Sequence, residues 1–240
     1  MRSDCRMLET VLTDGLDALS IPYTDETVKR FRTYYSLLEE RGNHMNLTAI
    51  SGEADVARLH FLDCASVLGF LDTEGVQLLD IGSGAGFPGL VLKILCPSLD
   101  LTLLDSQQKR VCFQLEVCDA LGFQDVRCLH LRAEEAPPEM REHYGIVISR
   151  AVARLNVLSE LCVPFVRPGG IFCAMKGPAA QEELSEAAEA LRRLGAPAPQ
   201  LLSYSVPGLD AERTLVVAAK TGRTPSCYPR RFAQIKKQPL

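Results

Sequence analysis

The chain has 240 residues, of which 47% are hydrophobic and 23% are charged, a composition typical of one ordinary globular unit and not of a collagen-like or low-complexity chain. No run of about 18 apolar residues is present, which excludes a transmembrane helix, and Asp14 and Asp17 interrupt the amphipathic N-terminal stretch, which argues against a signal peptide; we expect a cytoplasmic protein. The net charge of −4, taken alone, argues against a polyanionic partner.

The first 75 residues predict an all-helical cap. Apolar residues recur with a spacing near 3.6 in two stretches, and a third helical stretch follows a polar loop. The predicted helices cover residues 4–19, 24–41 and 53–71. We therefore assign residues 1–75 to a helical N-terminal cap.

From Val76 onward, short apolar strands alternate with helices. The predicted strands are 76–81, 100–105, 126–130, 145–149 and 171–175, and the predicted helices are 88–95, 107–121, 152–165 and 180–194. This alternation indicates parallel strands joined by right-handed crossovers, and hence an open, doubly wound α/β sheet.

The alternation ends with two further strands, 200–206 and 213–219. The link between them contains no helix, and so short a link favours an antiparallel return because parallel strands need a longer crossover. The sequence therefore predicts a mostly parallel seven-stranded sheet with one antiparallel strand. The domain that holds this sheet covers 76–220, and 221–240 is left as a C-terminal tail.

The strongest motif is the string DIGSGAGFPG at 80–89, which follows the first strand of the sheet and opens a helix. Its alternating glycines are Gly82, Gly84 and Gly86. Glycines let the backbone turn tightly and approach a ligand at the carboxyl end of a strand, where open α/β sheets bind ligands. Read from Gly84, the string also matches G-x-G-x-x-G, and Asp105 lies 21 residues further on, so a dinucleotide fold competes with other interpretations.

Acidic residues after the first three strands favour S-adenosylmethionine (SAM) over a dinucleotide. A dinucleotide site holds a pyrophosphate at the helix N-terminus, where Asp80 would be unfavourable, whereas SAM carries a sulfonium cation and an amino acid. Asp105 ends the second strand, where it suits the two ribose hydroxyls, and Ala133 and Glu134 follow the third strand, where they suit an adenine edge. Each residue alone has an ordinary interpretation, such as a helix N-cap for Asp105, and the ordered set carries the prediction.

These residues closely resemble the bacterial 16S ribosomal RNA guanine-N7 methyltransferases, the GidB or RsmG family. The matching strings are MNLTAI at 45–50, HFLD at 60–63, LLDIGSGAGFPGL at 78–90, LLDSQQKRVCF at 103–113, RAEE at 132–135, ISRAVARL at 148–155, KG at 176–177, ERTLVV at 212–217 and the ending YPRRFAQIKKQPL. The resemblance implies a Rossmann-like class I SAM-dependent methyltransferase. It also implies the target, which is N7 of guanine 527 in the 530 stem-loop of 16S rRNA, as bare RNA or in the 30S subunit.

The resemblance also implies roles for individual residues. It implies SAM contacts at Gly82 and Phe87, at the pair Ala133-Glu134 and at Arg150. It further implies residues that line the catalytic face or meet RNA, namely Asn46, His60, Asp63, Lys109, Arg132, Lys176 and Arg213. Among the basic residues, Arg132, Arg150 and Lys176 are the candidates for positioning the guanine.

The chemistry of guanine N7 predicts that the site has no general base. This nitrogen carries an in-plane lone pair and no proton, so its attack on a methyl group needs only alignment of the reacting atoms. We therefore expect His60 to be a structural histidine that is bonded to Asp63, three residues further on.

The charge of the chain is unevenly distributed. Residues 220–240 carry six basic and no acidic side chains, and a cluster of this kind, interspersed with aromatic residues, is typical of an RNA contact. The candidates for this contact are Arg230, Arg231, Lys236 and Lys237. We predict that deletion of 223–240 weakens rRNA binding with little change in SAM affinity.

Nine cysteines are scattered along the chain without a C-x-x-C pair, which indicates reduced thiols and neither a disulfide framework nor a metal site. We expect a monomer that binds neither a membrane nor a metal. Two other functions stay open from the residues alone. One is an NAD-dependent oxidoreductase that uses the same glycine loop, and the other is a non-catalytic RNA-binding assembly protein.

Overall fold

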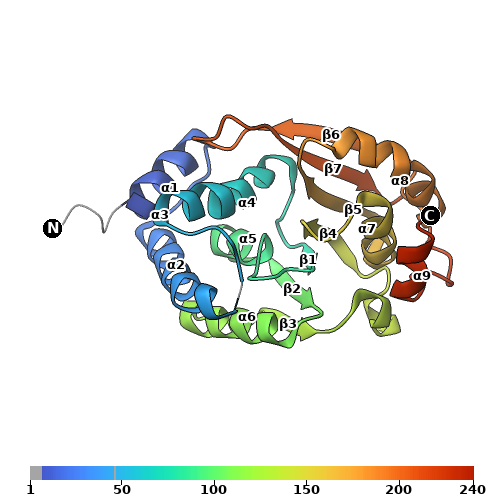
Figure 1. Cartoon of the computed structure of the whole chain (residues 1–240), viewed down its shortest axis with the longest axis horizontal. Coiled ribbons are helices and arrows are strands. Elements are labelled where there is room, and N and C mark those ends of the chain that lie inside the picture. Colours follow the sequence, from blue (N-terminus) through green and yellow to red (C-terminus); the bar gives the residue numbers. More distant parts are fainter. Residues whose placement is uncertain (1–6, 46) are drawn as a thin grey trace.

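A seven-stranded sheet forms the centre of the computed structural model, which describes residues 7–45 and 47–240 (Figure 1). The strands are β1 (Gln77–Ile81), β2 (Asp100–Asp105), β3 (Arg127–His130), β4 (Tyr144–Arg150), β5 (Val166–Lys176), β6 (Pro199–Tyr204) and β7 (Arg213–Ala219). Their order is β3-β2-β1-β4-β5-β7-β6. The first five strands pair in parallel, and β7 runs antiparallel to both β5 and β6. This confirms the predicted sheet.

Helices cover both faces of the sheet. They are α1 (Met7–Ala18), α2 (Asp25–Met45), α3 (Glu53–Val56), α4 (Asp63–Ala65), α5 (Gly89–Leu95), α6 (Gln108–Leu121), α7 (Leu155–Cys162), α8 (Ala180–Leu194) and α9 (Phe232–Lys237). Figure 1 shows α1, α2 and α6 toward one end of the molecule and α8 and α9 toward the other. Within the described residues, no helix is both long and apolar enough to span a membrane.

The alternation of side chains along each strand divides the core in two. In β1, Leu78 packs with residues of the cap, α5 and α6, whereas Leu79 packs with residues of α7 and α8. Ile146 and Ile148 of β4 lie on the same side as Leu78, and Val147 lies on the other. Successive side chains of a strand point to opposite faces, so these central strands are apolar at nearly every position.

Two predicted helices are shorter or less regular than expected. The stretch 53–71 is divided into α3, a π-helical turn at Ala57–Leu62, α4 and a 3₁₀ turn at Ser66–Phe70. The sequence did not predict this division, because apolar spacing barely distinguishes these helix types. The stretch 152–165 becomes helical only at Leu155. Between β4 and this helix, Ala151 has a φ of 55°, which is incompatible with the right-handed helical conformation.

The C-terminal segment 221–240 contains an ordered element. Its helix α9 contacts α7, and Ile235 on α9 is fully buried. Thr224 is also buried, and its hydroxyl donates to the Leu194 carbonyl. The segment is therefore packed against the body of the protein over much of its length, which the prediction of a basic tail did not anticipate.

Candidate functional site

The loop between β1 and α5 depends on glycine at two positions. Gly82 and Gly86 have φ values of 71° and 101°, a region that favours glycine. A Cβ atom on Gly82 would lie 2.4 Å from Cγ2 of Val152, and one on Gly86 would lie 2.4 Å from Cδ1 of Leu90. Both the backbone angle and the available space therefore require glycine here.

The carboxylates of Asp80 and Asp105 hold this loop in place. Oδ2 of Asp80 accepts the Gly89 N–H at 2.8 Å, and Oδ2 of Asp105 accepts the Gly84 N–H at 2.9 Å. Oδ1 of Asp105 accepts a second backbone N–H, from Gln107. Both side chains are almost fully buried. The structure thus gives these residues a part in shaping the loop, and their predicted contact with a cofactor stays a prediction.

A cavity of about 130 Å³, here called the β3 cavity, opens beside the glycine loop. It is lined by Ile81, Gly82, Leu104, Ser106, Leu131, Arg132, Ala133, Glu134, Val152, Leu161 and Phe232. Apart from Leu161 of α7 and Phe232 of α9, the lining residues come from the carboxyl ends of β1 to β4 and the segments that follow them, where open α/β sheets bind ligands. The β3 cavity therefore brings together Gly82, Ala133 and Glu134, and their predicted contact with SAM stays a prediction. Gly84, Gly86 and Phe87 do not line this cavity.

The residues around the β3 cavity fit SAM. Its volume is well below the several hundred Å³ of a complete ligand site, so it suits one end of the molecule, such as the flat adenine. Asp80 lines neither cavity, but it precedes Ile81 of the β3 cavity, and its Oδ1 is buried without a hydrogen-bond partner in the described chain. Burial raises the pKa of this carboxyl well above its usual range, and a bound cationic group would restore its charged form.

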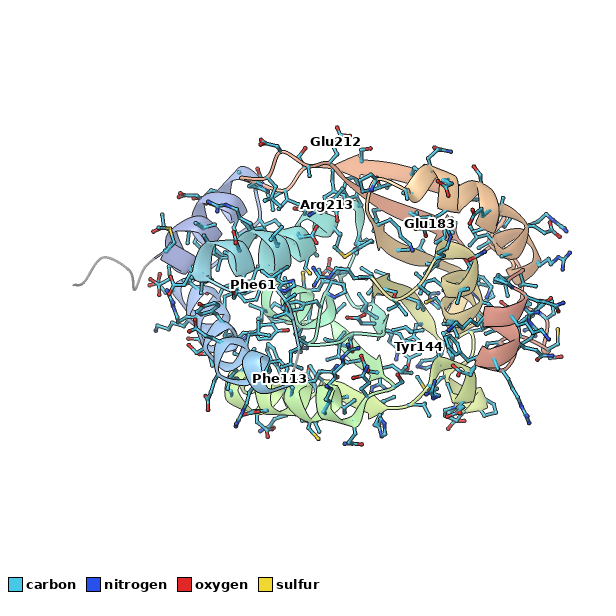
Figure 2. The ribbon with its side chains drawn as sticks, viewed as in Figure 1. Phe61, Phe113, Tyr144, Glu183, Glu212 and Arg213 are labelled. Carbon is cyan, nitrogen blue, oxygen red and sulfur yellow. The ribbon has the colours of Figure 1, made fainter. Side chains whose placement is uncertain are left out.

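A second cavity of about 330 Å³, here called the β5 cavity, lies on the other side of the end of β4. It is lined by Ile50, Leu59, His60, Asp63, Arg150, Ala151, Met175, Lys176, Gly177, Tyr204 and Arg213. Arg150 and Ala151 line this cavity, and the next residue, Val152, lines the β3 cavity. The chain that follows β4 therefore forms a partition between the two spaces. In Figure 2, Arg213 extends from the start of β7 at this side of the sheet.

Arg150 is the centre of the polar network in the β5 cavity. Its guanidinium donates to Oδ2 of Asp63 at 3.2 Å, to the Leu59 carbonyl at 3.2 Å and to Nδ1 of His60 at 2.9 Å. It also lies 5.0 Å from the centre of the Phe87 ring, a distance at which a cation is attracted by the aromatic face. These partners fix the plane of the guanidinium at the wall of the cavity.

His60 does not bond to Asp63, which corrects the expectation from their spacing. Its Nδ1 accepts from Arg150, which can only donate, so the remaining proton lies on Nε2, which contacts the Thr48 hydroxyl at 2.7 Å. The ring also stacks on Phe87, with centroids 4.4 Å apart. Burial, followed by the neighbouring Arg150 charge, lowers the pKa of His60 to about 3. The imidazole is therefore neutral and orients Arg150.

Asp63 is shared among three partners. Besides Arg150, its carboxylate accepts from the hydroxyl of Tyr204 at 3.2 Å and lies 3.5 Å from Nε of Arg213. Arg213 thus reaches the cavity from β7, although it lies far along the sequence from the cap residue with which it pairs. Two arginines that share one buried carboxylate leave a net positive charge at this wall.

Lys176 lines the β5 cavity, but its ammonium group is directed to other partners. Nζ donates to the Ala153 carbonyl at 2.6 Å and to Oε2 of Glu183 at 2.8 Å. The same Glu183 oxygen accepts the Leu155 N–H, and Figure 2 shows Glu183 on α8. Lys176 therefore holds the 151–155 segment to α8, which the sequence reasoning did not include.

Those remaining RNA-binding candidates that the structure describes lie outside both cavities. Asn46 is outside the described residues, and Lys109, Arg231, Lys236 and Lys237 are exposed. Arg230 differs from them because its Nη2 donates to Oε2 of the fully buried Glu160 at 2.6 Å. The charge of Arg230 is therefore compensated within the protein, and its predicted contact with RNA stays a prediction.

Several residues of the two cavities were not predicted. Ser106 directly follows Asp105, so its place at a strand end is a signal that could have identified it. Val152, Leu161 and Phe232 reach the β3 cavity through packing that no local pattern reveals. Among the described residues, no group of three or more His, Cys, Asp or Glu side chains is arranged to hold a metal ion.

Comparison with solved structures identifies the fold. A putative SAM-dependent methyltransferase from Methanococcus maripaludis superposes with a TM-score of 0.56 at 12% identity, over 79% of this chain and 93% of that one. A predicted O-methyltransferase from Agrobacterium tumefaciens superposes with a TM-score of 0.54 at 21% identity, over 69% and 82% of the two chains. The sheet is thus that of the class I SAM-dependent methyltransferases.

Comparison of sequences identifies the family. The model of the GidB family, described as rRNA small subunit methyltransferase G, matches residues 27–211. A protein named ribosomal RNA small subunit methyltransferase G from Pelotomaculum thermopropionicum is 42% identical over 98% of this chain and 99% of its own length, and one from Acetivibrio thermocellus is 39% identical over 97% of each. The chain belongs to the rRNA small subunit methyltransferase G family and is an enzyme with SAM as its cofactor.

Proposed function

We propose that this enzyme transfers a methyl group from SAM to N7 of guanine 527, in the 530 stem-loop of 16S rRNA. Membership of the family supports ribosomal RNA of the small subunit as the substrate. The observation that supports N7 is the chemistry of the β5 cavity, which is cationic and, among the residues that the structure describes, has no side chain poised to remove a proton. We further infer that the enzyme acts in the cytoplasm, where ribosomal subunits are assembled.

The described residues of the β5 cavity suit an acceptor that needs no base. His60 is neutral, but its Nδ1 lone pair is already engaged by Arg150 and its Nε2 is at the Thr48 hydroxyl. Lys176 is paired with Glu183. Guanine N7 fits this arrangement because it has a free lone pair and no proton. Transfer to it requires alignment of three atoms, which is the main contribution a rigid site makes.

The roles of the lining residues follow from this arrangement. When bound, SAM supplies an electrophilic methyl group on its sulfonium. Arg150 is held by four contacts with its plane at the cavity wall, where it suits a hydrogen bond or stacking contact with a guanine that has left its stack. Arg213 adds a second donor on the same side. Arg132, exposed and 3.9 Å from Glu134, is proposed to guide the base from the direction of the β3 cavity.

Contact with the rest of the RNA is proposed for exposed basic side chains. Lys109 follows β2, and Arg231, Lys236 and Lys237 lie in the C-terminal segment; Asn46, outside the described residues, stays a candidate that the family resemblance implies. Lysines and arginines of this kind bind phosphate without reading sequence. The affinity of the protein for rRNA should therefore fall steeply as the salt concentration rises.

The deciding experiment is mass mapping of modified nucleotides after the protein and SAM are incubated with bare 16S rRNA or with 30S particles that lack the modification. We expect one 7-methylguanine, at nucleotide 527, in at least one substrate. Absence of 7-methylguanine from both substrates, or methylation at another atom, contradicts the proposal. The Gly82→Asp variant is the control, because its side chain would collide with Val152 and fill the β3 cavity, and it should lose SAM binding and methylation together.

A further inference from the structure

The C-terminal segment reaches the β3 cavity. Phe232, the first residue of α9, lines this cavity together with Leu161 of α7 and with Glu134, which follows β3. Figure 1 shows α9 beside α7, at the end of the molecule opposite the cap. An aromatic side chain from the end of the chain thus meets residues that follow the central strands.

The position of Phe232 is fixed by the residues on either side of it. Two positions before it, Arg230 binds Glu160 through Nε, through Nη2 and through its backbone N–H, at 2.6 to 2.8 Å. Three positions after it, Ile235 is fully buried against the α7 side of the core. Further back, Arg141 donates to the Tyr228 carbonyl. Phe232 therefore lies between an anchored ion pair and an anchored apolar side chain.

Glu160, to which the C-terminal segment is attached through Arg230, lies next to the β3 cavity. Glu160, which binds Arg230, and Leu161, which lines the cavity, are consecutive residues of α7. The buried Glu160 carboxylate would be costly without its partner, so the ion pair keeps the segment closely applied to this part of α7. The arrangement places Phe232 at the cavity with little freedom to move away.

The chemistry around Phe232 suits a flat aromatic ligand with a donor at its edge. The side chains of Leu131 and Leu161 provide apolar surfaces, and the Phe232 ring adds an aromatic one while remaining 37% exposed at the mouth of the cavity. The carboxylate of Glu134, which is only 9% exposed, can accept a hydrogen bond from an exocyclic amino group. Adenine, the base of the established cofactor, has both features.

We infer that Phe232 forms the outer wall of the adenine site, so that the C-terminal segment is part of the cofactor-binding site and not only a surface for RNA. This inference rests on SAM as the cofactor and on the placement of its adenine in the β3 cavity. It revises the expectation stated from the sequence. Deletion of 223–240 removes Phe232 as well as the basic residues, and should weaken the binding of SAM together with that of rRNA.

The direct test is the affinity of the full-length Phe232→Ala variant for SAM, measured by titration calorimetry without RNA. Base–aromatic stacking predicts about a tenfold weaker Kd, with the same factor for adenosine as the probe. Phe232→Tyr should restore most of the affinity. The matched control is Leu115→Ala, an apolar residue on α6 that is 46% exposed and lines neither cavity, and it should bind SAM as the unaltered protein does.

A second measurement uses the absence of tryptophan from the chain. Phe232→Trp introduces a single tryptophan, which can be excited selectively over the six tyrosines and whose emission should change on addition of SAM or adenosine. The emission of Leu115→Trp should not respond. The inference is overturned if Phe232→Ala binds SAM within twofold of the unaltered protein, including the case in which it loses only RNA affinity. It is also overturned if Phe232→Trp binds SAM by calorimetry without a change in emission.

These outcomes are independent of the proposed target. SAM affinity is measured without RNA, so failure to find 7-methylguanine would leave the test of Phe232 intact. Conversely, unchanged SAM affinity in Phe232→Ala would leave the assignment of guanine N7 untouched.

Discussion

Removal of Arg230 tests whether the C-terminal segment is anchored through a buried ion pair. In Arg230→Ala, the Glu160 carboxylate, which is fully buried, loses both hydrogen bonds from the guanidinium and keeps only the backbone N–H of residue 230. Loss of one partner of a buried ion pair costs about 3–5 kcal/mol. Because the Arg230 side chain is 22% exposed and one hydrogen bond to Glu160 survives, we expect a loss of stability at the lower end of this range, about 3 kcal/mol.

The cost should appear as local opening of the segment, since it is the last element of the chain. Hydrogen exchange reports this opening at the amides of Gln234 and Ile235 in α9 and of Gln238 directly after it, which donate to backbone carbonyls within the segment. A loss of about 3 kcal/mol corresponds to roughly 100-fold faster exchange at these amides. Amides of the central strands should exchange as in the unaltered protein.

Arg231→Ala is the matched control. It removes the same type of side chain from the adjacent, exposed position, and surface substitutions of this kind change stability by less than about 0.5 kcal/mol. Equal exchange rates for α9 in the two variants would refute the reasoning, because the ion pair with Glu160 would then contribute nothing to holding the segment. A double variant in which Glu160 and Arg230 are both replaced by methionine should recover much of the protection.

Two further predictions follow from the electrostatics. The pKa of His60 is lowered from 6.5 to about 3, so the unfolded chain binds a proton that the folded chain excludes. The contribution of His60 to the free energy of unfolding should therefore be complete above pH 6.5 and fall toward pH 3, with a slope approaching about 1.4 kcal/mol per pH unit. Urea unfolding at pH 5 and 7 should show that the His60→Gln variant lacks this part of the pH dependence. The same pH dependence in the variant and the unaltered protein would contradict the prediction. Replacement of Lys236 and Lys237 by glutamine should reduce the slope of log affinity against log salt for rRNA by about one to two, and an unchanged slope would exclude them as phosphate contacts.

The sequence predicted those features that depend on strand order and backbone conformation. Residues that follow parallel strands must gather at one edge of the sheet, which is why Gly82, Ala133 and Glu134 meet in one cavity and Arg150 lies beside it. The glycine loop was equally accessible to prediction, because a positive φ at the end of a strand leaves a clear sequence signal.

The partners of these residues could not be predicted, since they depend on the angles at which distant elements pack. Spacing suggested that His60 bonds to Asp63, but the π-helical turn that contains His60 directs its ring to Phe87 and Arg150. Phe232 had no signal beyond its place in a basic segment. Contacts of this kind are decided by the way α7 and α9 sit on the sheet, and no local pattern encodes that angle.

The basic residues of the C-terminal segment are less available to RNA than their number suggests. Of the six in 220–240, Lys220 is fully buried and lies 3.3 Å from Glu142, and Arg230 pairs with Glu160. Acidic residues of the sheet domain thus compensate two of the six charges. The four that are exposed are Arg223, Arg231, Lys236 and Lys237. Because each neutralised phosphate contributes roughly 0.7–0.9 to the salt slope, the contribution of this segment to rRNA binding is bounded near four phosphates, not six, and the Arg230–Glu160 pair serves to hold the segment against α7.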